Sequence, residues 1–485
     1  MSLSPFATSV ELSRALAARE ISASEATERT IARIEALDGA INAICVKTYD
    51  RARAAAKAAD ERLARGERGP LLGVPMTIKE SFNLAGTPTT WGFPTARDFR
   101  PATTALAVER AERAGAVVLG KTNVPLNLGD WQSYNEIYGV TNNPYDLGRS
   151  PGGSSGGSSA ALAAGFGALS LGSDIGGSLR VPAHFCGVYA HKPTHDLCPS
   201  RGHTPPGVPP LPGSVDLAVI GPMARSATDL ESLLDVIAGP DEIDMGVGYR
   251  LALPPARADS FAGFRVLLLD RHPLVETQAC VVDALEALGR GLEAAGAKVA
   301  RGSDLMPDLA AAAPLYIHLL CATFALRSTD AEYADMVAAT AVLDPADRGM
   351  AAQQLRGSTT SFREWFFASA RRNGLRAQWR ALFREFDAVV TLVTPTPAFP
   401  HDHEPDQSKR KLMVNGAPQD YFANVLWPGV ATLPGLPATA LPIGRSPEGL
   451  PIGAQIIGPW LEDRTPLRLA QLIEREFGGF APPPL

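Results

Sequence analysis

Hydrophobic and polar residues follow two different periods along this chain. Short, mainly apolar runs of strand length occur at 73–80, 115–120, 264–270, 387–393 and 437–443. Between them, apolar residues recur at helical spacing over 103–115, 226–239 and 280–296. Strands that alternate with helices in this way predict an α/β protein with a large mixed β-sheet core flanked by helices.

The segment 8–38 is expected to form two helices. Thr8 precedes Glu11, and Ser22 precedes Glu25, by three residues. This spacing is that of the capping box, in which each side chain bonds the backbone N–H of the other residue. Both helices are therefore expected to begin just after the hydroxyl residues.

Two segments depart from this alternation. The segment 199–216 is rich in proline and glycine and is long for a connection inside a compact domain, which favours a functional loop. The segment 305–380 carries helices with mixed apolar and aromatic residues, which either cap a site or fill the core. Because no charged or low-complexity linker divides the sequence, we expect residues 1–485 to form a single domain, with 305–380 as its helical cap region.

Composition narrows the class of protein further. The 485 residues include 45 Lys and Arg against 51 Asp and Glu, a net charge of −6, with no basic block typical of nucleic-acid or membrane binding. The five cysteines are odd in number and form no C-x-x-C motif, which argues against a disulfide framework or a structural zinc site. The sequence shows no apolar signal core and no membrane-length apolar run. We therefore expect a cytoplasmic protein that binds neither nucleic acid nor membrane.

The segment from Arg149 to Arg180, RSPGGSSGGSSAALAAGFGALSLGSDIGGSLR, has several alternative interpretations. A Gly/Ser tract is often a linker, but this one leads directly into a small-residue helix and an apolar strand. A P-loop needs a lysine after its glycines, and a dinucleotide fingerprint needs a strand before Gly152. The G-x-S-x-G match at Ser155 also lacks the strand that precedes a nucleophile elbow. Glycines where a helix begins can instead bind an oxyanion through backbone N–H groups, which favours a catalytic site.

This segment resembles the signature sequence of the amidase signature family. Similar blocks follow in the family's order along nearly the whole chain, namely GVPMTIKE (73–80), GKTNVPLNLGDWQSYNEIYGVTNNPYD (120–146), GPMARSATDL (221–230), TPTPAFP (394–400) and LPGLPATALPIGRSPEGLPIGAQIIGP (433–459). Several motifs in one order are far more specific than a single glycine pattern. The resemblance implies the amidase signature fold and hydrolysis of C–N bonds.

By position, the resemblance implies a Ser–cis-Ser–Lys triad. Ser178 would be the nucleophile, and Ser154, which follows a cis peptide bond with Gly153, would bridge it to Lys79. Ser155 would form hydrogen bonds near the triad without attacking. Lysine can take a proton from serine only when it is neutral, and burial lowers its pKa in that direction. The position of Lys79 at the end of an apolar strand is consistent with such burial.

The resemblance also implies an oxyanion hole in the DIGGS motif. It would consist of successive backbone N–H groups, those of Ile175, Gly176, Gly177 and Ser178. An ion pair between Asp174 and Arg180 would brace the same turn. Both features would stabilise the negative charge that develops on the substrate carbonyl oxygen.

Other residues near these motifs carry weaker expectations. Leu128 and Gly129 lie in the block that borders the acyl pocket in related enzymes, so they are candidate substrate-binding residues. Glu80 should point to the opposite face of its strand from Lys79 and is not assigned as its partner. Ser158 and Ser159 stand where Gly, Glu or Ala is expected, and we place them on an exposed helix surface.

The resulting hypothesis is an amidase that cleaves linear amides, and also aryl esters and carbamates, through a covalent acyl-enzyme. It needs no cofactor or metal, and the HDHE motif at 401–404 lies on a loop where neighbouring residues rarely share one metal. Its partner would be a small amide, ester or carbamate of apolar or aryl character, and the protein would be a monomer or homodimer. Two alternatives stay open: the glutamine-hydrolysing component of a tRNA-dependent amidotransferase, known as its A subunit, and a non-catalytic binding protein on the same fold.

Overall fold

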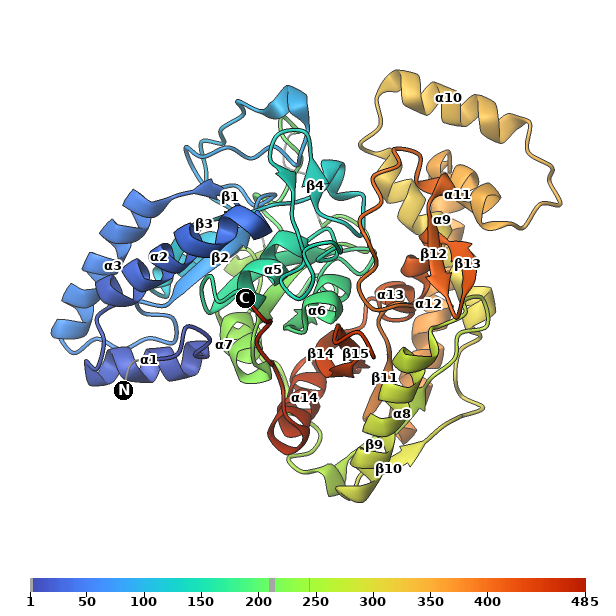
Figure 1. Ribbon diagram of the computed structural model, residues 1–485. Coiled ribbons are helices and arrows are strands. Elements are labelled where there is room, and N and C mark those ends of the chain that lie inside the picture. Colours follow the sequence, from blue (N-terminus) through green and yellow to red (C-terminus); the bar gives the residue numbers. More distant parts are fainter. Residues whose placement is uncertain (1–2, 209–213, 244) are drawn as a thin grey trace.

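A mixed β-sheet forms the centre of the computed structural model, which describes residues 3–208, 214–243 and 245–485 (Figure 1). Its strands are β1 (Ile44–Lys47), β2 (Pro75–Lys79), β3 (Val117–Thr122), β6 (Leu169–Asp174), β7 (Tyr189–Lys192), β8 (Val219–Ala224), β9 (Arg265–Leu269), β10 (Lys298–Ala300), β11 (Ala388–Leu392), β14 (Ala438–Arg445) and β15 (Pro451–Ile457). In the described part of the chain, these eleven strands follow the order β1-β3-β2-β6-β8-β7-β14-β15-β11-β9-β10. Strand β2 runs parallel to β3 and β6, and β9 runs parallel to β10 and β11, whereas the other neighbours are antiparallel.

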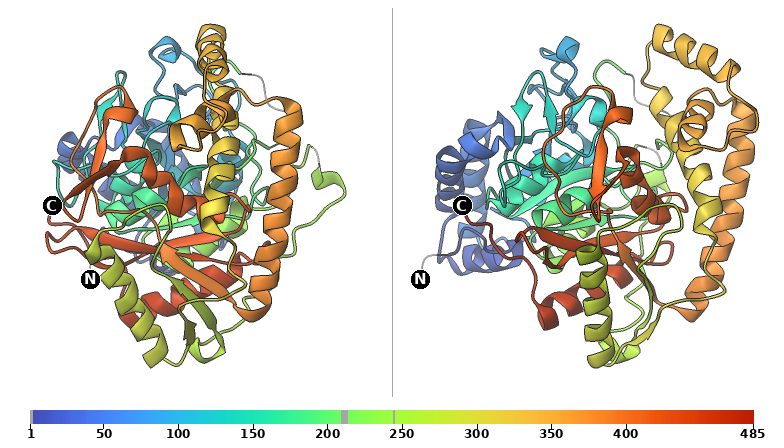
Figure 2. Two further views of the ribbon diagram at one scale, coloured as in Figure 1. Left: turned by 90° about the vertical axis from the view of Figure 1, so that its right-hand side faces the viewer. Right: turned by 45° about the vertical axis from the view of Figure 1, so that its right-hand side comes forward.

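Helices cover both faces of this sheet (Figure 2). They are α1 (Ser9–Ala18), α2 (Ala23–Ile41), α3 (Tyr49–Ala64), α4 (Leu106–Arg113), α5 (Gly156–Ala163), α6 (Arg180–Cys186), α7 (Ala227–Ile237), α8 (Ala279–Ala294), α9 (Leu309–Ala325), α10 (Asp330–Ala341), α11 (Met350–Ser358), α12 (Phe362–Glu385), α13 (Leu426–Thr432) and α14 (Arg464–Phe477). Two small hairpins lie outside the sheet, β4 (Tyr134–Asn135) with β5 (Gly139–Val140), and β12 (Lys411–Val414) with β13 (Ala417–Asp420). The predicted fold class, a large mixed sheet flanked by helices, is confirmed.

Every strand and helix expected from the periodicity is present, with ends shifted by at most three residues. The small-residue helix and apolar strand expected after the Gly/Ser tract are α5 and β6. In the described part of 199–216 no helix or strand forms, as expected for a loop, and residues 209–213 lie outside the described residues.

The first two helices begin where the hydroxyl residues predicted. Thr8 and Glu11 form the complete capping box, with both reciprocal hydrogen bonds present. Ser22 accepts the N–H of Glu25, but the Glu25 side chain turns along the helix to pair with Arg29 at 2.6 Å. The second capping box is therefore only half formed, because an i, i+4 ion pair competes for the same carboxylate.

The buried apolar residues join elements from the whole length of the chain. One large cluster extends from Leu12 on α1 to Ile473 on α14 and includes residues of β2, β6, β11 and β15. Near the two ends, the rings of Phe6 and Phe480 lie 5.7 Å apart. Among the described residues, no helix is both long and apolar enough to cross a membrane.

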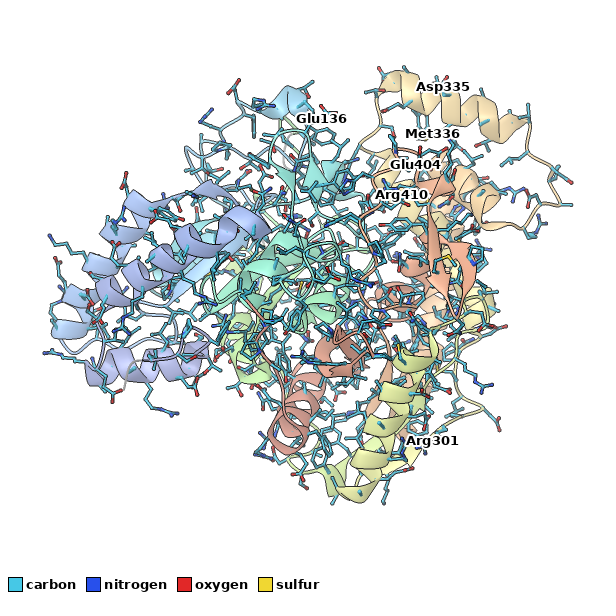
Figure 3. All side chains as sticks on the ribbon, in the orientation of Figure 1. Glu136, Arg301, Asp335, Met336, Glu404 and Arg410 are labelled. Atoms are coloured by element: carbon cyan, nitrogen blue, oxygen red, sulfur yellow. The ribbon has the colours of Figure 1, made fainter. Side chains whose placement is uncertain are left out.

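The segment 305–380 is helical, as expected, and consists largely of α9 to α12. Helix α9 packs against α11, α12 and α13, which connects this group to the sheet side of the molecule. Helix α10 has no buried residue, and its Asp335 and Met336 lie at the outer edge of the molecule (Figure 3). The outermost part of this segment therefore contributes little to the core.

Candidate active site

Lys79 ends strand β2, all of whose residues are buried. Its Nζ donates hydrogen bonds to Ser154 Oγ at 2.7 Å and to Ser173 Oγ at 2.9 Å. Burial lowers the pKa of Lys79 well below its ordinary value; the positive charge of Arg327 acts in the same direction and the charge of Asp174 opposes it. A lysine held in this way gives up its proton easily and can serve as a base.

Ser154 and Ser155 lie immediately before α5, in the Gly/Ser tract. The peptide bond between Gly153 and Ser154 is cis, as the family resemblance implied. Ser155 Oγ lies 3.3 Å from the carbonyl oxygen and 3.4 Å from the backbone nitrogen of Ser173, and its own N–H donates to Ser178 O. The Ser155 side chain therefore connects α5 to strand β6, whereas the Ser154 hydroxyl reaches Lys79.

Ser178 follows β6 in a tight turn that only glycine allows at one position. Gly177 has a φ of +97°, and a Cβ added there would lie 2.6 Å from Pro428 Cγ on α13. The Ser178 side chain forms no hydrogen bond with Ser154 in the described residues. Such contacts often tighten only when substrate is bound.

The backbone N–H groups of this turn have different partners. Asp174 accepts two of them, from Gly177 at 3.0 Å and from Leu179 at 3.1 Å. In the described part of the chain, no acceptor lies against the others, which belong to Ile175, Gly176 and Ser178. Three of the four expected oxyanion donors are therefore free, whereas the N–H of Gly177 is engaged by Asp174.

Asp174 and Arg180 form the expected ion pair, completely buried and bidentate, with contacts of 3.0 and 2.9 Å. Burial acts to raise the pKa of Asp174, but Arg180 and nearby backbone N–H groups overcome it, so the pKa lies below its ordinary value. Arg180 also donates to Pro428 O, Gln455 Oε1 and Thr432 Oγ1. A buried pair satisfied this fully fixes the turn against α13 and β15.

Two aromatic side chains hold the carbonyl groups of the same turn. Tyr316 on α9 donates its hydroxyl to Ile175 O at 2.7 Å, and Trp131 donates its indole N–H to Gly176 O at 2.9 Å. A trans peptide is planar, so fixing its C=O on one side directs its N–H to the other. Tyr316 thereby orients the N–H of Gly176, and Trp131 orients the N–H that Asp174 accepts.

The candidate substrate-binding residues Leu128 and Gly129 lie in the segment that leads to Trp131. Leu128 is buried and packs with Trp91 and Val124. The Gly129 carbonyl accepts a hydrogen bond from a glutamine side chain. The described contacts bring neither of them to Lys79 or to the serines, so their role in binding substrate stays a prediction.

Two residues of this site were missed from the sequence. Ser173 is the second partner of Lys79, and it lies on β6, which pairs with β2. Its position directly before Asp174 was a usable signal, because neighbouring parallel strands end at the same sheet edge. Tyr316 gave no such signal, since it lies 141 residues from Ile175 on a helix of ordinary apolar pattern.

The expectation for Ser158 and Ser159 is wrong. Both are fully buried, because α5 lies in the interior and not at the surface. Ser158 Oγ shares a hydrogen bond of 2.7 Å with Thr122. Glu80 behaves as expected: its carboxylate accepts backbone N–H groups of the following loop, among them that of Trp91, and does not contact Lys79.

The histidines of the HDHE motif contact neighbouring loops. His401 Nε2 lies 3.0 Å from Asn142 Oδ1, and the ring of His403 stacks on Tyr134 with centroids 4.0 Å apart. Within the described residues, no cluster of three or more His, Cys, Asp or Glu side chains could hold a metal ion.

The fold and the site together define the class of protein. A mixed β-sheet flanked by helices, with a buried lysine at the end of one strand and two serines and a glycine turn nearby, is typical of an amidase. The family model described as Amidase matches residues 25–467. The chain belongs to the amidase signature family and is an enzyme of the hydrolase or amidotransferase type that acts on C–N bonds.

Similar proteins within the family have different functions. The chain is 34% identical to the A subunit of the glutamyl-tRNA(Gln) amidotransferase of Anaeromyxobacter sp. (strain K), over 98% of this chain and 97% of that protein. It is 30% identical to fatty-acid amide hydrolase 2-A of Danio rerio, over 98% and 90%. Among solved structures, a chain of a vestigial protein complex that reveals the evolutionary origins of an s-triazine catabolic enzyme superposes with a TM-score of 0.81 at 30% identity, over 97% of this chain and 98% of that chain. A bacterial aryl acylamidase shares the fold, with a TM-score of 0.80 at 23% identity, over 98% and 96%.

Proposed function

We propose that this enzyme hydrolyses the amide bond of a small-molecule substrate through an acyl-enzyme on Ser178. The observation that carries the proposal is the buried contact of 2.7 Å between Lys79 Nζ and Ser154 Oγ. It gives a buried lysine with a lowered pKa a serine hydroxyl as its partner, and the N–H of the next residue, Ser155, bonds the carbonyl oxygen of Ser178 at 3.2 Å, which supports Ser154 as the relay. A base, a relay and a nucleophile in this order are what serine acylation requires.

The proposed reaction has two steps. The Ser178 hydroxyl oxygen attacks the carbonyl carbon while its proton passes to Ser154, whose own proton passes to Lys79. The N–H groups of Ile175, Gly176 and Ser178 stabilise the resulting oxyanion. The C–N bond then breaks as the leaving amine takes the proton back. Water attacks the acyl-enzyme by the same route and releases the acid.

The substrate class is proposed from the surroundings of the site. The aromatic residues of 305–380 and the proline-rich segment 199–216 favour acyl groups with apolar or aryl parts. Aryl esters and carbamates fit the same mechanism, because each offers a carbonyl carbon and a leaving group. We also propose that the chain is a single domain with a helical cap, and that its five unpaired cysteines suit the cytoplasm.

A second candidate function is that of the glutamine-hydrolysing component of a tRNA-dependent amidotransferase. The observation that favours it is the 34% identity, over nearly the full length of both chains, to such a component. In this case the enzyme would release ammonia from glutamine and would need partner proteins. Glutamine hydrolysis that appears only with co-purifying proteins would support this candidate over an independent amidase.

The experiment combines a substrate panel with two serine variants. Wild type, Ser178→Ala and Ser155→Ala are assayed with aryl anilides, fatty amides, aryl carbamates and glutamine, and acylation by a serine-directed fluorophosphonate is followed by intact mass. We expect Ser178→Ala to abolish both turnover and labelling. Ser155→Ala should retain labelling, because its side chain contacts the backbone of Ser173.

The opposite result contradicts the assignment. If Ser155→Ala loses labelling and Ser178→Ala keeps it, Ser155 is the nucleophile. If circular dichroism shows that the wild-type protein is folded, but it is neither labelled nor active on any panel member, the remaining alternative, a non-catalytic binding protein on this fold, is favoured.

A further inference from the structure

Arg327, just beyond the C-terminal end of α9, has no carboxylate partner among the described residues. Its guanidinium donates to Asn127 O at 3.2 Å and lies 3.5 Å from Asn127 Oδ1, with no ion pair at this residue. Burial lowers the pKa of Arg327 to about 10. Burying part of a cation without a counter-ion lowers the free energy of unfolding, so a functional role for this residue would explain its presence.

Two other buried arginines of this protein have more acceptors for their N–H groups. Arg180 has Asp174 in a bidentate ion pair. Arg225 donates to four backbone carbonyl oxygens, which satisfy most of its N–H groups. Arg327 has the oxygens of a single residue, so part of its guanidinium fork is left without an acceptor from the described residues.

The Arg327 side chain is nevertheless held in one place. Its guanidinium carbon lies 4.9 Å from the ring centroid of Trp91 and 5.4 Å from that of Phe324. Stacking on two rings and a hydrogen bond to Asn127 fix the plane of the group. A pre-positioned planar cation matches a carboxylate, which it can bind through two parallel hydrogen bonds.

This cation lies beside the candidate active site. The ring of Trp91 is 5.1 Å from that of His203, whose Nε2 is 2.9 Å from the hydroxyl of Ser81, two residues after Lys79. The positive charge of Arg327 also lowers the pKa of Lys79, after the larger effect of burial. Along the chain, Asn127 begins the segment that leads to the buried Trp131.

Helix α9 connects Arg327 directly to the turn of the DIGGS motif (174–178), which is the proposed oxyanion turn. Tyr316 bonds the Ile175 carbonyl, and Arg327 follows it by 11 residues (327 − 316), just beyond the end of the same helix. The two points are separate, so a substrate that meets Arg327 needs a spacer between its scissile carbonyl and its anionic group, and a series of chain lengths measures that spacer.

We propose that Arg327 binds a carboxylate of the substrate, and that the preferred substrates are amides with a carboxylate several bonds from the scissile carbonyl. This inference rests on the proposed amidase function and narrows its substrate class. Phe324 would pack against the carbon chain next to the carboxylate, whereas the buried Trp91 holds the guanidinium of Arg327 in place.

Matched substrate pairs test the proposal. Succinyl, glutaryl and adipoyl p-nitroanilides are compared with butyryl, pentanoyl and hexanoyl p-nitroanilides, in which a methyl group replaces the carboxylate. We expect wild type to prefer at least one acid over its neutral match by 30-fold or more in kcat/KM. At a pH on the plateau of both pH–rate profiles, where Lys79 is neutral in both proteins, Arg327→Gln should remove this preference, mainly through KM, and leave the neutral compounds within threefold. Arg327→Lys should recover part of it.

The control variant is Arg363→Gln. Arg363 also stacks on an aromatic ring, at 5.3 Å from the centroid of Phe367, but lies on the exposed start of α12. It should leave both series unchanged. A second readout needs no turnover: glutarate or adipate should slow fluorophosphonate labelling of wild type and not of Arg327→Gln.

Each contrary outcome has a distinct meaning. Equal rates for acids and neutral compounds, or equal losses for both in Arg327→Gln, overturn the inference and leave the amidase function standing. Labelling that the dicarboxylates do not slow overturns it as well. A wild-type protein that the phosphonate does not label and that cleaves no anilide contradicts the amidase function itself.

Discussion

Lys79 depends on two hydroxyl groups, and no carboxylate of the described residues lies within ion-pair distance of its ammonium group. Burial outweighs the attraction of Asp174, so folding shifts Lys79 towards its neutral form. The burial that makes Lys79 a better base therefore lowers the free energy of unfolding, as is common for residues at functional sites. Both the rate and the stability should consequently depend on pH.

The activity should rise with pH as Lys79 loses its proton. Below the lowered pKa of Lys79, kcat/KM for a neutral anilide should fall about tenfold per pH unit, because one proton inactivates the base. Arg327→Gln should move this limb to higher pH, since the charge of Arg327 keeps the pKa down. A pH–rate profile of both proteins measures this, and a flat profile in wild type contradicts a lysine base.

The same shift affects stability in a defined direction. At pH values between the lowered pKa of Lys79 in the folded protein and its ordinary pKa in the unfolded chain, Lys79 binds a proton in the unfolded chain but not in the folded protein. The contribution of this group to the free energy of unfolding therefore increases as pH rises through that window.

Ser173→Ala should slow the reaction without unfolding the protein. It removes one of the two hydrogen bonds of Lys79, which we expect to lower kcat about tenfold, roughly 1.4 kcal/mol, with KM little changed. Ser170→Ala is the matched control, because Ser170 lies on the same strand and bonds Thr77 at 2.9 Å. Steady-state kinetics decide the matter: equal effects of the two changes would mean a general disturbance of β6.

At the scale of elements, the oxyanion turn is held from three sides. Asp174 and Arg180 brace it from within, Tyr316 holds it from α9, and α13 packs against Gly177. Strand β6, which ends at Asp174, and helix α6, which begins at Arg180, flank the turn in sequence, but α9 and α13 do not, so the geometry also depends on tertiary packing.

Gly177→Ala should abolish most of the activity. The added methyl group meets both the positive φ and Pro428 on α13, which displaces the N–H groups of the turn. We expect kcat to fall by at least about 100-fold, the scale of losing one oxyanion donor. Gly86→Ala is the control, because Gly86 has a similar φ of +78° but open space around its Cα. Comparable losses in both variants would attribute the effect to backbone strain alone.

The strands and helices with clear periodicity could be predicted from the sequence, but several central strands could not. Strand β8 contains glycine and proline, and β15 contains a glycine and a buried glutamine, so neither shows a continuous apolar run. The proposed triad residues were assigned from the order of the motifs, whereas the contacts of Tyr316 and Arg327 arise from α9 folding back over the sheet. No local pattern encodes that placement.

At the scale of the whole molecule, the helices of 305–380 have unequal roles. Helix α9 reaches the oxyanion turn through Tyr316, whereas α10 has no buried residue. The proposed cap therefore has an inner part that contacts the glycine turn and an outer part that contributes no buried residue.

Replacing α10 with a short Gly/Ser linker should leave the core intact. Because α10 contributes no buried residue to the core, the free energy of unfolding should change by less than about 1 kcal/mol. We expect kcat/KM for a small neutral anilide to stay within threefold, and that for long-chain amides to fall if α10 covers the acyl chain. Chemical denaturation and kinetics measure both, and loss of folding would show that α10 supports the core.

During translation, strands β14 and β15, which follow β7 in the strand order of the sheet, are synthesised long after β7. Strands β1 to β8 are complete at residue 224, but β7 gains its second neighbour only when β14 begins at residue 438, after another 214 residues (438 − 224). At about 5–20 residues per second, the growing chain exposes that unpaired strand edge for roughly 10–40 s. An open apolar edge is a template for aggregation. We therefore expect the yield of this protein from a cell to depend on translation speed and chaperone supply as well as on the stability of the finished fold.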